Sequence, residues 1–194
     1  PESAYDNIMR CFEFNIPVVC GTTGWIQKLP EVHKICLEKN QSFFYASNFS
    51  IGVNIFFEIN KRLAALMNTQ TNYDEVLVHE CHHLQKLDSP SGTAKKLGEI
   101  AAQSLGLTYE QAVRNGREGI TDNIRSCSEI GMHAVRGGDI VGDHTVLFAG
   151  MGERIELRHM AHSRKTFAQG AVTAAKWLAT RRPGLYSMRD VLGL

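Results

Sequence analysis

Residues 75–94 read EVLVHECHHLQKLDSPSGTA, and this run joins a strand, a turn and the start of a helix. Within Glu75–Glu80, Val76 and Val78 lie on one side and Leu77 on the other, and this β-branched content favours a strand that ends at the histidines. The Asp, Ser, Pro and Gly that follow are typical of a tight turn. Apolar residues at helical spacing come next, at Leu97, Ile100, Ala101 and Leu105. We therefore predict that Ser91, Gly92 and Thr93 lie at the beginning of a helix.

Two side chains of this run suit proton transfer. His82 and Lys86 are four residues apart, a spacing that places them on one side of either a helix or a strand. A histidine can pass a proton near neutral pH, and a lysine supplies a compact positive charge. The first N–H groups of the following helix have no internal partner and can bind a carboxylate or a phosphate. The run thus predicts proton transfer beside an anion-binding turn.

Two other interpretations of the histidines stay open. Isolated histidines are mostly structural, at the surface or at the end of an element. The His-Glu-Cys-His-His run at residues 79–83 could also bind zinc, because His and Cys are its usual ligands. No second ligand pair with zinc-finger spacing is present, so we predict no metal ligands.

Two further loops follow short apolar runs that are typical of buried strands. Ile16–Cys20 leads into Gly21–Gly24, and Ser42–Ala46 leads into Ser47–Ser50. In an open α/β sheet, ligands bind outside the carboxyl ends of the strands, so these loops could line one crevice. Glycine lets the backbone approach a flat ligand, and hydrogen bonds could come from Thr22, Thr23 and Asn48. The Gly-Thr-Thr-Gly segment is equally compatible with an ordinary turn.

Seven segments spread over nearly the whole chain match one enzyme family. They lie within residues 17–24, 48–54, 80–94, 136–142, 152–154, 162–168 and 188–192. The most specific is the His-His-x-x-Lys-x-Asp-x-Pro-Ser-Gly-Thr pattern of residues 82–93. On these residues the chain resembles the 4-hydroxy-tetrahydrodipicolinate reductases, also called dihydrodipicolinate reductases, of lysine and diaminopimelate biosynthesis.

This resemblance implies an activity and a set of catalytic residues. A family member transfers a hydride from NADH or NADPH to a small cyclic dicarboxylate and so makes tetrahydrodipicolinate. The resemblance implies that His82 donates the proton, with Lys86 as its electrostatic partner and alternative donor. It implies that the substrate carboxylates are held by His83, Gly92 and Thr93. A metal-binding or non-catalytic oligomerisation domain derived from the same fold is the alternative function.

The resemblance also implies a binding site for the nicotinamide end of the cofactor. Its residues are Gly21, Thr22, Thr23, Ala46, Ser47, Asn48 and Phe49. The family opens with a strand and a G-x-G-x-x-G turn, which this sequence lacks. We therefore expect the chain to be incomplete and to bind dinucleotide poorly alone, because the pyrophosphate site is missing. The absent segment normally selects NADH or NADPH, so the sequence predicts neither.

We predict an α/β protein with a partial Rossmann-like, doubly wound sheet followed by an α+β domain with a mixed open sheet. Residues 1–50 are expected to form the C-terminal half of a dinucleotide-binding domain, onto which residues 166–194 can pack. Residues 51–165 are expected to form a substrate-binding and tetramerisation domain. The expected helices cover 3–15, 30–39, 53–67 and 166–180, and the expected strands of the second domain, besides the one before His79, cover 123–135, 143–150 and 154–162.

Composition is that of an ordinary globular enzyme. The chain is 43% hydrophobic and 21% charged, with a formal net charge of +1, so nothing favours nucleic-acid or membrane partners. The five cysteines are odd in number and lack paired spacing, which favours free thiols and a cytoplasmic location. The partners we expect are the small dicarboxylate substrate and, from the resemblance, three further copies in a homotetramer.

Overall fold

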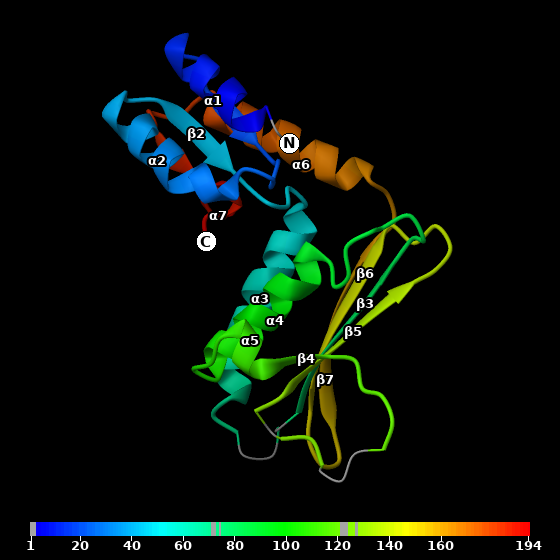
Figure 1. Cartoon of the computed structure of the whole chain (residues 1–194). Coiled ribbons are helices and arrows are strands. Elements are labelled where there is room, and N and C mark those ends of the chain that lie inside the picture. Colours follow the sequence, from blue (N-terminus) through cyan, green and yellow to red (C-terminus); the bar gives the residue numbers. More distant parts are fainter. Residues whose placement is uncertain (1–2, 71–72, 74, 121–123, 127) are drawn as a thin grey trace. The chain divides into compact units, whose positions relative to one another are not determined.

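The computed structural model describes residues 1–194 except 1–2, 71–72, 74, 121–123 and 127 (Figure 1). Two compact units are present. The first runs to Asn54 and resumes over Lys165–Leu194, and the second is Ile55–Arg164. Helix α3 (Ile51–Met67) begins in the first unit and continues into the second. Each unit has its own sheet and its own buried core.

The first unit is built on three short parallel strands. Their order is β1 (Val18–Cys20), β2 (Ser42–Tyr45) and β8 (Gly184–Tyr186). The helices of this unit are α1 (Ala4–Glu13), the 3₁₀ helix η1 (Ile26–Lys28), α2 (Leu29–Glu38), α6 (Lys165–Leu178) and α7 (Met188–Leu192).

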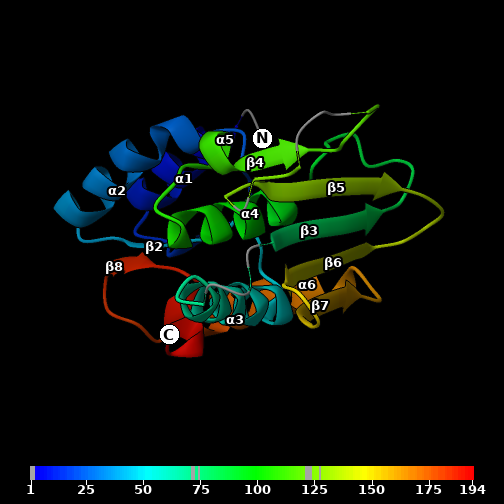
Figure 2. The ribbon, with the colours of Figure 1, turned by 90° about the horizontal axis from the view of Figure 1, so that it is seen from below.

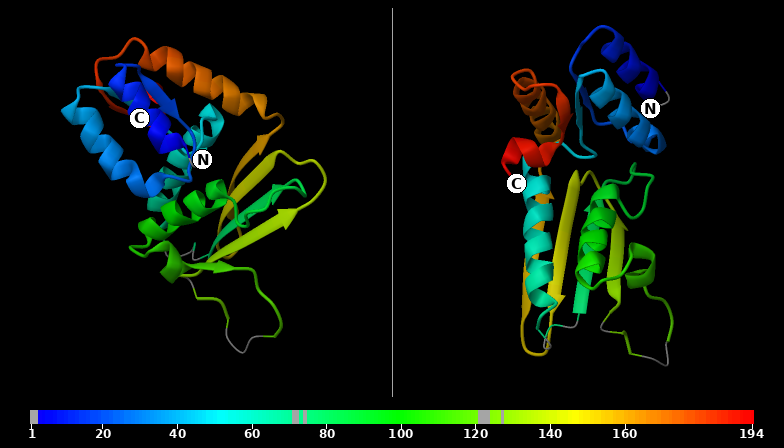
Figure 3. Two further views of the ribbon diagram at one scale, coloured as in Figure 1. Left: turned by 45° about the horizontal axis from the view of Figure 1, so that its top comes forward. Right: turned by 90° about the vertical axis from the view of Figure 1, so that its left-hand side faces the viewer.

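Adjacent residues of β2 point into two different cores. Phe43 packs with apolar residues of α1 and α2, whereas Phe44 packs with those of α6 and α7. Because successive side chains of a strand face opposite sides, helices cover both faces of the sheet. Figure 3 shows this arrangement, with the blue helices α1 and α2 on one side and the orange α6 on the other. The doubly wound arrangement predicted for this part of the chain is confirmed.

Helix α6 passes very close to the loop after β2. A Cβ atom at Gly170 would lie 1.8 Å from the backbone oxygen of Phe49, so no other residue fits there without a backbone shift. The ring of Phe49 stacks on Phe44, with the ring centroids 5.9 Å apart. These contacts join α6 to the sheet of the first unit.

The second unit contains a mixed five-stranded sheet (Figure 2). The order is β4 (Val113–Asn115), β5 (Ile130–Arg136), β3 (Glu75–His82), β6 (Gly142–Ala149) and β7 (Arg154–Ala161). Strands β4, β5 and β3 are parallel, and β6 is antiparallel to both β3 and β7. Burial alternates strictly along β6, which shows that one face of the sheet is packed and the other is not.

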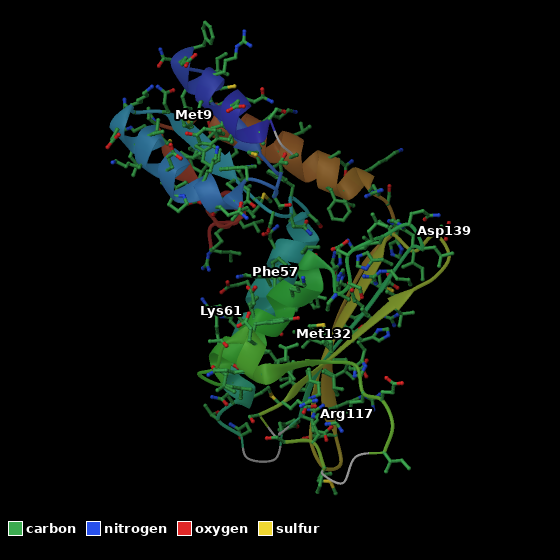
Figure 4. All side chains as sticks on the ribbon, in the orientation of Figure 1. Met9, Phe57, Lys61, Arg117, Met132 and Asp139 are labelled. Carbon is green, nitrogen blue, oxygen red and sulfur yellow. The ribbon has the colours of Figure 1, made fainter. Side chains whose placement is uncertain are left out.

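Helices α3 and α4 (Gly92–Ser104) pack on one face of this sheet (Figures 1 and 3). The core between them takes Met132, labelled in Figure 4, from the sheet, with Leu97 from α4 and Phe56 from α3. The short helix α5 (Tyr109–Ala112) follows α4 and leads into β4. Among the described residues of this unit, no helix covers the opposite face of the sheet.

The helices and strands predicted from the sequence agree with the observed ones except for one strand and for the shortest helices and strands. A strand was expected to begin at Asn123, but Asn123 lies outside the described residues, and β5 begins only at Ile130. The residues described between these positions form no strand, because apart from the exposed Ile124 they are polar and provide no apolar face. The pattern also did not reveal η1, α5, β4, β8 and α7, which have only three to five residues each and too few positions to show a period.

Candidate functional site

Strand β3 carries the centre of the candidate site on its packed face. Val78, Glu80 and His82 are buried, and they alternate with more exposed residues on the other face. Glu80 is completely buried, and His82 is 8% exposed. A carboxylate and an imidazole thus occupy positions where a strand of this kind normally places apolar side chains.

The start of α4 lies beside this carboxylate. Ser91 is the N-cap residue, and its Oγ accepts a hydrogen bond of 3.1 Å from the Ala94 N–H. The backbone N–H of Ser91 donates to Glu80 Oε1 at 2.8 Å. Gly92 is exposed and Thr93 is half-buried, so the first turn of the helix can receive an anion. The predicted helix start is therefore confirmed.

The two oxygens of Glu80 have different partners. Oε1 accepts from the Ser91 N–H and from Arg136 Nη2, the latter at 3.0 Å. Oε2 lies 3.1 Å from His82 Nδ1 and 3.5 Å from His144 Nε2. Neither Oε2 nor His82 Nδ1 has an ideally directed hydrogen bond among the described residues, and both are fully buried. The two atoms face each other at 3.1 Å.

The neighbours of His82 fix both sides of its ring. Nδ1 faces the carboxylate, whereas Nε2 lies only 2.9 Å from the position that a Cβ of Gly142 would occupy. His144 stands directly opposite Glu80 in the antiparallel ladder of β3 and β6. The rings of His82 and His144 meet edge to face, with centroids 5.0 Å apart.

The chain after β3 is held by the turn between β5 and β6, where Figure 4 labels Asp139. The backbone N–H of His83 donates to the carbonyl of Ile140 at 2.7 Å, and that of Gly137 donates to the carbonyl of His82 at 2.9 Å. His83 is half-buried. These bonds place His83 immediately after the buried cluster.

The prediction that His82 and Lys86 lie on one side of the same helix or strand was wrong. They were expected on one side of a single element, but His82 is the last residue of β3 and Lys86 lies in the following turn. Lys86 Nζ donates to Asp88 Oδ1 at 2.7 Å, and the carbonyl of Asp88 accepts from Arg136 Nη2 at 2.6 Å. Arg136 also binds Glu80, so one guanidinium connects the lysine turn to the carboxylate beside His82.

In the first unit, the two predicted loops lie side by side at the carboxyl ends of β1 and β2. The Ala46 N–H donates to the Cys20 carbonyl at 3.2 Å. A Cβ at Gly21 would lie 2.7 Å from the ring of Phe49, so this glycine makes room for a buried ring of the same chain. Asn48 Oδ1 accepts from the Ser50 N–H at 2.9 Å and shapes the second loop. The sequence predicted that the two loops are adjacent. It did not predict that residue 21 is a glycine because the ring of Phe49 lies against it.

These loops suit a dinucleotide in position and in chemistry. They end neighbouring parallel strands, which is where nucleotides bind in open α/β sheets. Gly21, Thr23 and Ser47 are exposed, and Thr22 and Asn48 are half-buried, so their polar groups are within reach of a ligand. Ala46 and Phe49 are buried and instead support the loop from within.

Two members of the buried cluster, Glu80 and His144, have lowered pKa values. Burial alone would raise the pKa of Glu80, but hydrogen bonds from His144, His82 and Ser91 outweigh burial and hold that pKa far below its usual range. Burial lowers the pKa of His144, and the nearby carboxylate opposes the change only in part. Glu80 is therefore a carboxylate beside a neutral His144.

The lowered pKa of His144 predicts how stability depends on pH. Below pH 6.5, the ordinary pKa of histidine, His144 is largely protonated in the unfolded chain but less so in the folded chain. Because the unfolded state then binds more protons, the free energy of unfolding should rise from about pH 5 to pH 7. The pKa of Glu80 is also lowered, but its contribution is complete above 4.5 and is lost only below that value. Urea midpoints measured across this range should show the rise.

A variant isolates the contribution of His144. His144→Gln should flatten the rise in part, because His33 and His159, whose pKa values burial also lowers, act in the same direction. A variant with an unchanged slope would contradict the assignment of this proton to His144.

Comparison with known proteins identifies the family. A family model described as "Dihydrodipicolinate reductase, C-terminus" matches residues 52–192. The chain belongs to this family. Its curated relatives include 4-hydroxy-tetrahydrodipicolinate reductases from Chromobacterium violaceum, 45% identical over 100% of this chain and 71% of the relative, and from Akkermansia muciniphila, 48% identical over 93% of this chain and 71% of the relative. The resemblance inferred from the motifs is confirmed.

A solved structure of the dihydrodipicolinate reductase family shares this fold. It is described as "Dipicolinate bound Dihydrodipicolinate reductase from Paenisporosarcina sp. TG-14", is 25% identical, and covers 96% of this chain and 68% of its own chain. The TM-score is 0.72, which confirms the predicted fold class. Among the helices that the structure describes, none has both the length and the apolarity needed to cross a membrane.

Three residues of the buried cluster were not predicted as site residues from the sequence. They are Glu80, Arg136 and His144. The signal was present in two of them. Glu80 and His144 each occupy an inward position of a strand whose inward face also carries apolar side chains, Val78 in β3 and Val146 and Phe148 in β6. A polar residue at such a position needs a partner, because an unpaired buried charge is very costly. The partners themselves depend on strand register, which the pattern does not give.

Three groups of the cluster could also hold a metal ion. Glu80, His82 and His144 each place one ligand atom within 4.8 Å of the others. The guanidinium of Arg136 already neutralises Glu80 from the other side, which disfavours a second cation in the same place.

Proposed function

We propose that this chain takes part in the reduction of 4-hydroxy-tetrahydrodipicolinate to tetrahydrodipicolinate by NADH or NADPH, in lysine and diaminopimelate biosynthesis. The observation that carries the proposal is 45% identity over the whole chain to reductases of that name. The site agrees with it, because an imidazole backed by a carboxylate lies next to a helix start that can bind an anion.

The proposed cofactor site is in the first unit. Reduced nicotinamide supplies the hydride when it is bound. The residues that would hold it are Gly21, Thr22, Thr23, Ala46, Ser47, Asn48 and Phe49. Among them Phe49 would act from the core, because its ring fills the space that Gly21 leaves and so sets the spacing of the two loops. The unit that holds these residues would thus be the cofactor-binding domain.

The proposed substrate site is in the second unit. His82 would donate the proton, and Lys86 would supply positive charge and serve as an alternative donor. The carboxylates of the substrate would be held by His83 and by the backbone N–H groups of Gly92 and Thr93. A dicarboxylate suits this set, since it pairs anionic groups with a lysine and a helix N-terminus.

An assay tests the proposed activity directly. The complete reading frame and this 194-residue chain would each be mixed with freshly generated hydroxytetrahydrodipicolinate and either NADH or NADPH, and oxidation of the nucleotide would be followed. Turnover by the complete protein supports the proposal. A folded complete protein that oxidises neither nucleotide would show it to be wrong, and stoichiometric zinc in that protein would favour the metal-binding alternative.

Replacing Thr93 by Pro tests the anion-binding role of the helix start. Proline is tolerated in the first turn of a helix but has no N–H, so the fold should persist while one donor to the substrate is lost. We expect KM for the dicarboxylate to rise about 10- to 100-fold, since hydrogen bonds to charged groups are worth roughly 1.5–3 kcal/mol. Thr93→Ser, which keeps the N–H, is the control. A Thr93→Pro variant with the original KM would contradict the assignment.

We also propose a homotetramer that uses the uncovered face of the five-stranded sheet. That face carries half-exposed apolar side chains, among them Val135 and Met160, each 44% exposed. Apolar patches on a sheet without a covering layer favour association. Sedimentation analysis would give the number of copies. The cytoplasmic location predicted from the cysteine count stays a prediction.

A further inference from the structure

We infer that Glu80 is a positioning residue that sets the tautomer of His82 and ties the proton donor to the substrate-binding turn. Only the expected effects on kcat and KM rest on the proposed function. It follows from the contacts of one buried carboxylate with two separate parts of the site.

The first contact concerns the ring of His82. Glu80 Oε2 lies 3.1 Å from Nδ1, and the carboxylate is completely buried. A carboxylate accepts hydrogen bonds and cannot donate them, so Nδ1 carries a hydrogen in this arrangement. The ring can then gain or lose a proton only at Nε2. The carboxylate also fixes the orientation of the ring, as the buried aspartate of a serine-protease triad does.

The second contact concerns the turn that would hold the substrate. Glu80 Oε1 accepts the N–H of Ser91, the N-cap of α4, at 2.8 Å. The same oxygen accepts from Arg136, which also donates to the carbonyl of Asp88 at 2.6 Å. The side chain of Asp88 in turn accepts from Lys86 at 2.7 Å. One carboxylate therefore spans the imidazole, the helix start and the lysine turn.

The remaining neighbour, His144, completes the shell around Oε2. Its Nε2 lies 3.5 Å from that oxygen and 3.1 Å from Ser91 Oγ. Because His144 is neutral, it adds a hydrogen-bonding group without adding charge. Oε1 thus accepts two hydrogen bonds and Oε2 faces two imidazole nitrogens, and these neighbours favour the ionised form of the buried Glu80.

The substitution that tests this role is Glu80→Gln. Its carbonyl oxygen can still accept from Ser91 and Arg136, but its NH₂ group then faces His82 and forces Nδ1 to become an acceptor. We expect kcat to fall about 10- to 100-fold, the usual effect of losing the partner that orients a reactive histidine or ligand, with KM nearly unchanged. Glu80→Asp, which keeps the charge, should recover part of the rate.

A second comparison separates positioning from general damage to the fold. In a His82→Ala background, Glu80→Gln should cause no further loss of kcat, because the group that it positions is absent. A purely structural residue would lower the rate by the same factor in both backgrounds, and that result would overturn the inference.

A third measurement requires neither substrate nor a variant. The nitrogen chemical shifts of His82 in the wild-type protein at alkaline pH should report a neutral ring with its hydrogen on Nδ1. A hydrogen on Nε2 would overturn the inference even if the enzyme is active. Stoichiometric zinc bound through Nδ1 would overturn it as well. If instead the reductase assay fails while the Nδ1 tautomer is found, the proposed function is wrong and the Glu80–His82 pairing stands.

Discussion

His82→Ala is expected to lower kcat by about 10²- to 10⁴-fold with little change in KM, which is the usual range for loss of a general acid. The imidazole is 8% exposed and lies 3.1 Å from a buried carboxylate, and alanine removes this donor altogether, so the remaining rate would come from Lys86, the alternative donor. The groups predicted to bind the carboxylates of the substrate, His83 and the start of α4, remain in the variant. Binding should therefore survive while the proton step fails, and steady-state kinetics would show it.

A matched control lies on the same strand. His79→Ala removes an imidazole from the opposite, exposed face of β3. Provided that the assembly state is unchanged, it should leave kcat within about twofold of the wild type, since surface substitutions have small effects. A His82→Ala variant that turns over as fast as this control would exclude His82 as the proton donor.

Gly170→Ala is expected to destabilise the first unit by about 3 kcal/mol. In an ordinary helix this change would stabilise by up to roughly 1 kcal/mol, because alanine has the higher helix propensity. Here the added Cβ would lie 1.8 Å from the backbone oxygen of Phe49, so α6 or the loop after β2 must move. Overpacking of this kind typically costs about 1–3 kcal/mol or more.

The measurement can be confined to the unit concerned. Both tryptophans, Trp25 and Trp177, lie in the cores or core margins of the first unit, so their fluorescence during urea unfolding reports on that unit. Gln169→Ala changes the exposed neighbouring residue of α6 and should leave the midpoint nearly unchanged. Equal midpoints for the two variants would show that the close approach of α6 to Phe49 is absent in solution.

The sequence allowed the central part of the fold to be predicted because its signals are local. Alternation before His79, turn residues through Gly92 and a helical repeat after it define β3, the turn and α4 without knowledge of the rest of the chain. The same holds for α1, α2 and α3, whose apolar spacing is regular. Strand β8 could not be found, because three residues show no period and its partner β2 lies far away in the chain.

The site was predictable to the same limited extent. His82, Gly92 and Thr93 stand in a specific motif, so their proximity follows from the sequence. Glu80 meets Arg136 across 56 residues, and that meeting is fixed by how β5 and β6 align with β3. A shift of one residue in either alignment would move the partner to the other face of the sheet. Local patterns cannot supply this information.

The position of β3 between two strands that follow it in the chain has a consequence for biosynthesis. When Glu80 leaves the ribosome, neither Arg136 nor His144 has been made, so the strand carries an uncompensated charge in its middle. That charge opposes premature burial of the valine-containing strand and its pairing with other nascent chains. The carboxylate can enter the interior only when β5 and β6 arrive, so it delays closure of this core until synthesis of its sheet is nearly complete.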